Sequence, residues 1–255
     1  MTTYTYDATF QGLLTTIFEA YARGELDADI VPEDRYQEQF FSQPVAVATD
    51  EAKAKRVLAG LEKRSPGVTT WLHRIFLTEQ DGTERLILHY IRRQFATEMD
   101  VRKDASDEKV RQLMRLHQQM GREEHRMHAF VRFQETPDGL FVALINPDFN
   151  CLPLLGKHFG ARYPAMPWLI YDTTRHYGLH WDHVAKKAEF ITLTTSGNSN
   201  LRQLSAEMLA NKEEDYQEYW KAYFQAVDIP ERRNMQLHIQ HVPRRYWKYL
   251  VEKVG

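Results

Sequence analysis

The sequence predicts an α+β fold with a helical amino-terminal half, a small antiparallel sheet in the middle and a helical carboxyl-terminal segment. Apolar residues recur every three to four positions through residues 1–120, which is typical of amphipathic helices. Between residues 129 and 194 they alternate with polar residues, as in half-buried strands. The helical period returns after residue 200. We therefore expect three regions, 1–120, 121–195 and 201–255, or a single integrated domain made of all three.

Five helices are expected in the first region, and the first of them spans residues 11–22. One face of that helix carries Leu13, Leu14, Ile17, Phe18 and Tyr21 at the spacing of a buried stripe. Residues typical of helix ends separate the five helices: Gly24, Asp50, Ser65-Pro66, Asp81-Gly82 and Ser106.

The middle region is expected to form strands in the order ββαββ, with a possible fifth strand. A Thr-Pro-Asp-Gly turn at residues 136–139 separates the first two strands and is typical of a hairpin. The expected ranges are 129–134 and 140–146 for the first hairpin, 154–163 for the helix, 168–172 and 175–181 for the second hairpin, and 189–194 for the fifth strand.

The last region follows a small, polar linker at residues 196–200. An aromatic stripe beyond it keeps helical spacing, and we expect this stripe to pack in a core. Its members are Tyr216, Tyr219, Trp220, Tyr223, Phe224 and Val227.

Composition and missing motifs exclude several classes of protein. The single cysteine, Cys151, cannot form an internal disulfide, a four-thiolate zinc site or a four-iron cluster. Neither a leader-like amino terminus nor an 18-residue apolar run is present, so we expect a cytoplasmic protein without a membrane partner. The common phosphate-loop, dinucleotide and nucleophile-elbow motifs are missing, so no cofactor is expected and an enzymatic role stays open. His176, His180 and His183 lie close together, but nothing in the sequence makes them converge with other ligands, and no metal is expected.

Charge is distributed unevenly along the chain, although the formal net charge is only −2. Residues 1–45 hold eight carboxylates and two arginines, a local net of −6. Residues 232–248 hold four arginines and one lysine without a carboxylate, a local net of +5. A polyanion would be attracted to the carboxyl-terminal end, unless those arginines form ordinary ion pairs with acidic residues elsewhere.

A cluster in the middle region could carry acid–base chemistry. Glu124 and His125 precede Arg132, and further along the chain come His158, Arg162, Asp172, Arg175 and Tyr177. If these residues met, Glu124, His125 and Asp172 could act as acid and base while the arginines clamp a phosphate. The alternative is an arginine–carboxylate network that orders the sheet.

The carboxyl-terminal run combines arginine with aromatic rings. Guanidinium groups bind phosphate oxygens in pairs, and neighbouring rings offer faces on which bases stack. The expected nucleic-acid contacts are Arg132, Arg162, Arg175, Arg232, Arg233, Arg244, Arg245, Tyr246 and Trp247. Alternatively, Tyr246, Trp247 and Leu250 anchor a last helix to the core.

Four segments resemble a bacterial family that is labelled as a domain of unknown function and a probable DNA metabolism or DNA repair protein. They are residues 6–14 (YDATFQGLL), 124–133 (EHRMHAFVRF), 158–172 with its HFGARY and WLIYD motifs, and 243–247 (PRRYW). The resemblance implies association with a putative radical-SAM protein of DNA modification or repair, and in some relatives fusion to a domain similar to uracil-DNA glycosylase. Ala8 stands where a glycine is expected.

Three functions follow from these observations. The first is an accessory protein that binds single-stranded or distorted DNA and acts with a radical-SAM partner. The second is a DNA-processing hydrolase of nuclease or glycosylase type that uses Glu124, His125 and Asp172. The third is a non-enzymatic adaptor whose acidic residues 1–45 dock the partner.

Overall fold

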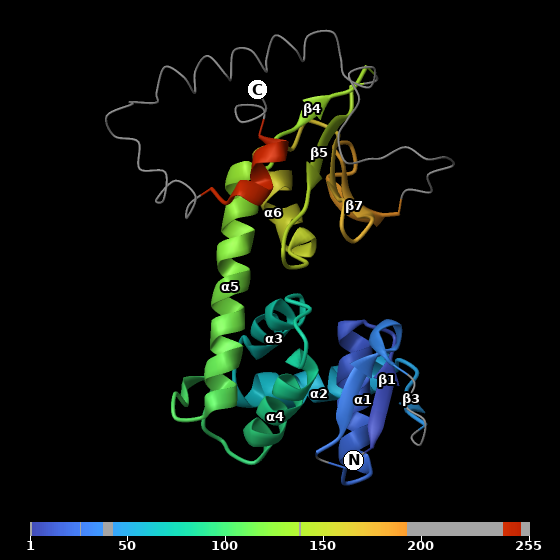
Figure 1. Cartoon of the computed structure of the whole chain (residues 1–255), viewed down its shortest axis with the longest axis vertical. Helices are drawn as coiled ribbons and strands as arrows, with labels where there is room; N and C mark the ends of the chain where they lie inside the picture. Colours follow the sequence, from blue (N-terminus) through green and yellow to red (C-terminus); the bar gives the residue numbers. More distant parts are fainter. Residues whose placement is uncertain (1, 26, 38–42, 138, 193–241, 251–255) are drawn as a thin grey trace. The chain divides into compact units, whose positions relative to one another are not determined.

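A computed structural model describes residues 2–25, 27–37, 43–137, 139–192 and 242–250 (Figure 1). It divides into two compact units, Met1–Gly121 (unit 1) and Arg122–Gly255 (unit 2). Each unit contains both helices and strands, which confirms the α+β class. The predicted linker, the aromatic stripe, Arg232 and Arg233 lie outside the described residues.

Unit 1 contains a three-stranded parallel sheet that the sequence did not predict. Strand β1 (Thr3–Tyr6) lies between β2 (Asp29–Pro32) and β3 (Val45–Ala46) and is parallel to both. The amino-terminal half is mainly helical, as expected, but it also holds these three short strands. The sequence missed these strands because they are only two to four residues long, and three consecutive residues of β1 are buried instead of alternating with exposed ones.

The helices of unit 1 follow the sequence prediction closely. They are α1 (Phe10–Ala22), α2 (Glu51–Arg64), α3 (Val68–Phe76), α4 (Thr83–Phe95) and the first part of α5 (Glu108–Phe130), which continues past Gly121 into unit 2, and the short 3-10 turns are η1 (Glu33–Arg35) and η2 (Val101–Lys103). The side chain of Asp50 caps α2 by accepting from the backbone N–H groups of Ala52 and Lys53. Helix α3 starts at Val68, two residues after the proline expected at its first position, and follows Gly67, whose φ of 80° lies in the left-handed region.

One apolar core holds unit 1 together. Apolar residues of α1, α2, α3, α4 and the first turns of α5 are fully buried in one cluster. Its most deeply buried aliphatic members include Leu13, Leu14, Ile17, Leu61, Leu72, Ile75, Ile91, Val110 and Leu113.

Unit 2 contains a five-stranded mixed sheet. Its strands are β4 (Gln134–Glu135), β5 (Phe141–Ile145), β6 (Trp168–Asp172), β7 (Tyr177–Asp182) and β8 (Lys187–Ile191), which lie side by side in that order. All neighbours are antiparallel except β5 and β6, which are parallel. The prediction of an antiparallel sheet was wrong at this pair, because helix α6 (Leu152–Arg162) returns the chain across the sheet before β6 begins.

The first predicted strand of unit 2 begins inside a helix. Helix α5 continues to Phe130, and only Gln134 and Glu135 pair as a strand, whereas residues 129–134 were expected to be extended. Met127 is buried and Phe130 half-buried three residues later. The helical spacing of these side chains therefore continues across the expected start of the strand.

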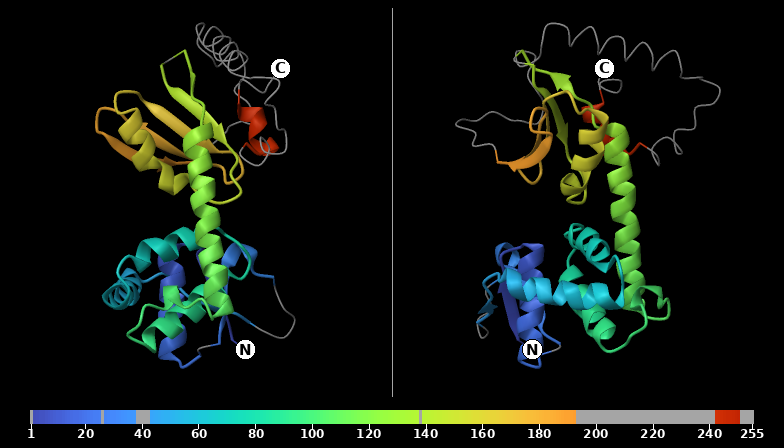
Figure 2. Two further views of the ribbon diagram at one scale, coloured as in Figure 1. Left: turned by 90° about the vertical axis from the view of Figure 1, so that its left-hand side faces the viewer. Right: turned by 180° about the vertical axis from the view of Figure 1, so that it is seen from behind.

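Helix α6 packs closely against the sheet (Figure 2). A Cβ atom at Gly160 would lie 2.7 Å from the ring of Trp181, so only glycine allows this approach. The Trp181 ring in turn stacks on Trp168, with 5.8 Å between ring centroids and 5° between planes. The 3-10 turn η5 (Arg244–Tyr249) contacts β5. Among the described residues, no helix combines the length and apolarity that crossing a membrane requires.

Candidate nucleic-acid interface on unit 2

A buried carboxylate on α5 fixes the carboxyl-terminal segment. The side chain of Glu123 is only 2% exposed, because it shares a helix face with Met127 and Phe130. Its Oε2 accepts from Nη2 of Arg245 at 2.9 Å, and its Oε1 accepts from the backbone N–H of Asp148 at 2.9 Å. The hydroxyl of Tyr246 also donates to Oε1. Glu123 therefore links helix α5 both to η5 and to the loop that follows β5.

Arg245 extends this network to a second carboxylate. Its Nη1 lies 2.8 Å from Oδ2 of Asp148, and its guanidinium lies 4.5 Å from the centroid of the Tyr246 ring. Burial, reinforced by the charge of Glu123, raises the pKa of the Tyr246 hydroxyl. The tyrosine thus keeps its proton and remains a hydrogen-bond donor to Glu123.

A second buried carboxylate, Asp172, ends strand β6. It is fully buried, and its Oδ1 accepts from the backbone N–H groups of Thr174 and Arg175 at 2.8 and 3.1 Å. Its Oδ2 accepts from Nη1 of Arg175 at 3.0 Å. The same guanidinium also donates to the carbonyl groups of Pro147 and Asp148, both at 3.2 Å. Asp172 and Arg175 therefore order the β6–β7 turn and the loop after β5 together.

Cys151 closes that loop as a buried thiol. Burial raises its pKa far above the usual range, and the nearby charges of Glu123 and Asp172 raise it further. The thiol therefore stays protonated at neutral pH, which argues against a nucleophilic role.

The three predicted acid–base residues occupy different environments. Glu124 is half-buried, His125 is exposed, and Asp172 is fully buried with both oxygens bonded to Thr174 and Arg175. Successive helix residues point about 100° apart, so the face of α5 that carries Glu123 does not carry His125. The contacts of Asp172 are those of the arginine–carboxylate network, the second of the two interpretations of this cluster.

The predicted nucleic-acid contacts divide into inward and outward groups. Arg175, Arg245 and Tyr246 point inward and take part in the network described above. Arg132 is half-buried, and its Nη1 donates to the carbonyl of Ala129 at 2.7 Å.

Two predicted arginines are exposed, and each lies over an aromatic ring. The guanidinium of Arg244 lies 5.8 Å from the Trp247 ring, and Nε1 of Trp247 donates to the carbonyl of Val242 at 3.0 Å. At the end of α6, the guanidinium of Arg162 lies 5.6 Å from the Tyr163 ring, and its Nε donates to the hydroxyl of Tyr163 at 3.1 Å. Each pair offers a cation and a ring at one surface position.

Glu123 and Asp148 are the site residues that the sequence interpretation missed. The helical spacing of Glu123 with Met127 and Phe130 was the signal that could have placed it inside. For Asp148 the sequence holds no comparable signal, since its role depends on where η5 packs. Within the described part of the chain, no group of three or more His, Cys, Asp or Glu side chains is placed to hold a metal ion.

Comparison with known proteins yields one match. The model of a domain of unknown function, DUF4130, matches residues 81–252. The matched range starts just before α4 and includes Glu123, Asp172 and all of η5. No curated protein and no solved structure matches the chain.

Proposed function

The chain belongs to the DUF4130 family, and we propose that it is an accessory protein of DNA repair or modification that binds single-stranded or distorted DNA through η5. One observation carries this proposal. Arg245 and Tyr246 anchor η5 to Glu123, while Arg244 of the same turn is exposed and lies over the half-buried Trp247 ring.

The anchor matters because binding costs less when the contacting groups are already ordered. A flexible arginine loses side-chain entropy when it contacts a phosphate, whereas Arg244 already lies over the Trp247 ring. Its guanidinium can bind phosphate oxygens in a fork, and the indole offers a face for an unstacked base. Arg162 and Tyr163 offer the same combination elsewhere on unit 2.

Fluorescence anisotropy of a labelled single-stranded oligonucleotide across a salt series tests the proposal. Each phosphate contact contributes about −0.7 to the slope of log K against log salt for single strands. We expect Arg244→Gln to weaken binding and to reduce the slope by about one contact. Trp247→Ala should weaken binding with little change of slope, because stacking releases no counterions.

The control variant is Arg115→Gln. Arg115 is an exposed arginine of unit 1 that pairs with Glu108, and its loss changes the net charge by the same amount. Equal effects of Arg244→Gln and Arg115→Gln would contradict a specific role of η5. Charge reversal at Arg245 is unsuitable as a test, because a carboxylate there would face Glu123 and Asp148 and would disturb the fold.

The partner that we propose is a radical-SAM protein of DNA modification or repair, and the support for it is the family resemblance of the sequence. Removing residues 1–45 cannot test an acidic docking surface, since those residues include β1, α1 and much of the unit 1 core. Glu33→Gln with Asp34→Asn removes two exposed carboxylates of η1 instead. Copurification of the partner with wild type but not with this variant would support the adaptor function as well.

A further inference from the structure

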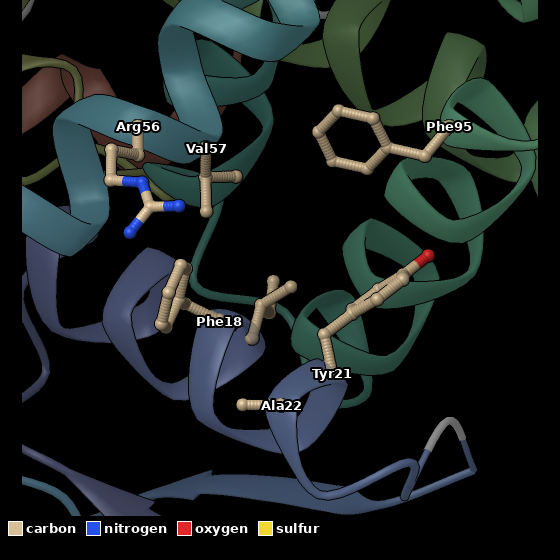
Figure 3. Close-up of a pocket in the computed structure, with 7 residues that line it drawn as sticks. Phe18, Tyr21, Ala22, Arg56, Val57 and Phe95 are labelled. Atoms are coloured by element: carbon tan, nitrogen blue, oxygen red, sulfur yellow. The ribbon is translucent and has the colours of Figure 1, made fainter.

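Unit 1 holds a pocket that the proposed DNA contacts do not use. Its volume is about 370 Å³, at the lower end of the range for small-molecule sites, and it opens between α1, α2 and α4 (Figure 3). Three aromatic rings, Phe18, Tyr21 and Phe95, line it together with aliphatic side chains. Walls of this kind suit a flat ring system of one or two rings.

The shape of the pocket depends on a glycine inside helix α2. A Cβ atom at Gly60 would lie 2.9 Å from the ring of Phe95, so glycine lets this ring lie against α2. The edge of the Phe95 ring meets the Tyr21 ring at 77°, with 6.2 Å between centroids. These contacts place the two aromatic walls independently of any ligand.

The polar groups at the pocket identify the charge of its ligand. Arg56 lies 5.1 Å above the Phe18 ring, and among the described residues no carboxylate is within ion-pair distance of its guanidinium. The hydroxyl of Tyr21 likewise makes no hydrogen bond within the described part of the chain. The guanidinium of Arg56 is thus left to interact with a ligand between the aromatic walls.

The other cations near the pocket are neutralised within the protein. Lys53 lies 6.0 Å from the Phe18 ring but forms ion pairs with Glu19 at 2.7 Å and Asp50 at 3.6 Å. Arg64 lies over the Phe95 ring and pairs with Glu98 at 3.7 Å. Of these three cations, Arg56 is therefore the one without a carboxylate within ion-pair distance among the described residues.

We propose that this pocket binds a small planar aromatic anion, with the ring between Phe18, Tyr21 and Phe95 and the anionic group on Arg56. Carboxylate and phosphate both satisfy a guanidinium in the same forked geometry. The ligand is therefore either an aromatic carboxylate or a nucleoside monophosphate, and these two classes of ligand differ in their ring systems.

Titration of the full chain with matched pairs of ligands tests this proposal. The probes are 2-naphthoate with its neutral counterpart 2-naphthamide, and AMP with adenosine, each followed by ligand-observed NMR. We expect the anion of at least one pair to bind about tenfold more tightly than its neutral counterpart. Preference for naphthoate indicates an aromatic carboxylate, and preference for AMP indicates a nucleotide. No binding, or equal binding of anion and neutral form in both pairs, overturns the proposal.

Two variants on the same helix separate a specific contact from general charge. Arg56→Gln should reduce binding of the anion to the level of its neutral counterpart. Lys55→Gln removes the neighbouring cation, whose side chain is 74% exposed and pairs with Glu51, and should leave binding unchanged. Equal losses in both variants would overturn the proposal, and circular dichroism shows whether each variant keeps its helices.

Discussion

Units 1 and 2 differ in what binds their carboxylates: the buried Glu84 of unit 1 accepts from the hydroxyl of Tyr6 rather than from an arginine. In unit 1, Asp50 and Asp100 lie at the margin of an apolar core, where they cap turns and bind nearby cations. In unit 2, Glu123 and Asp172 lie inside, and each is bound by an arginine. Removal of one partner from a buried pair leaves the other charge buried and uncompensated. In a pair at the margin of the core, the charge that remains is in contact with water, so its loss of a partner costs little. Unit 2 should therefore be the more sensitive to loss of a single charged side chain.

The largest effect is expected for Glu123→Ala. This change leaves Arg245 without its buried carboxylate and Tyr246 without its acceptor, so the free energy of unfolding should fall by about 3–5 kcal/mol. Urea unfolding followed by tryptophan fluorescence measures it. The double variant Glu123→Leu with Arg245→Met should recover much of the loss, because it removes both charges together. A loss below about 1 kcal/mol for Glu123→Ala would contradict the comparison between the units.

In unit 1 the corresponding sensitive position is apolar. Leu72 is fully buried in the core, and Leu72→Ala should lower the free energy of unfolding by about 2–4 kcal/mol through lost burial and a cavity. Trp71 is the only one of the five tryptophans within residues 1–121, so its fluorescence in a variant lacking the other four reports unit 1. Leu72→Met keeps most of the volume and should cost much less. Equal losses for both variants would show that side-chain volume is not what matters here.

The contribution of Asp100, a marginal carboxylate of unit 1, to the free energy of unfolding should depend on pH. Hydrogen bonds from Arg102 outweigh partial burial and, with one from Ser65, lower the pKa of Asp100 to about 2. Because the folded pKa is below the unfolded value, the contribution to stability is complete above about pH 4 and is lost as the pH falls toward 2. Asp100→Asn should therefore lose about 1–2 kcal/mol at pH 6 and much less near pH 2. Urea unfolding at both pH values tests this, and an equal loss at both would exclude the ionised carboxylate as its source.

The sequence predicted the helices better than the sheets for a physical reason. A helix such as α1 carries several turns of periodic side chains and recognisable end residues, so its signal is long. Strands β1 and β3 have four and two residues, and the parallel pairing of β5 with β6 depends on where α6 lies. Pairing of distant segments cannot be obtained from local periodicity.

The candidate site shows the same limit at the scale of single residues. The sequence identified the EHRMH segment and the arginine-rich carboxyl-terminal run, and the described part of that run does contact α5. It named Glu124 but not Glu123, the neighbour that binds Arg245 and Tyr246 and points about 100° away around the helix. The sequence also could not show that Arg245 points inward and Arg244 outward. In a short 3-10 turn these directions are set by the surface against which the turn packs.

The smallest effect concerns a helix cap at the edge of unit 1. The hydroxyl oxygen of Thr9 accepts from the backbone N–H of Gly12 at 2.9 Å and also donates to Asp7 at 2.7 Å. Thr9→Ala should lower the free energy of unfolding by about 1 kcal/mol, because an N–H group of the first turn of α1 loses its acceptor. Thr9→Ser keeps the hydroxyl group and should retain most of the stability. If Thr9→Ala matched the loss of Glu123→Ala, marginal and buried polar groups would contribute alike, and the contrast between the two units would fail.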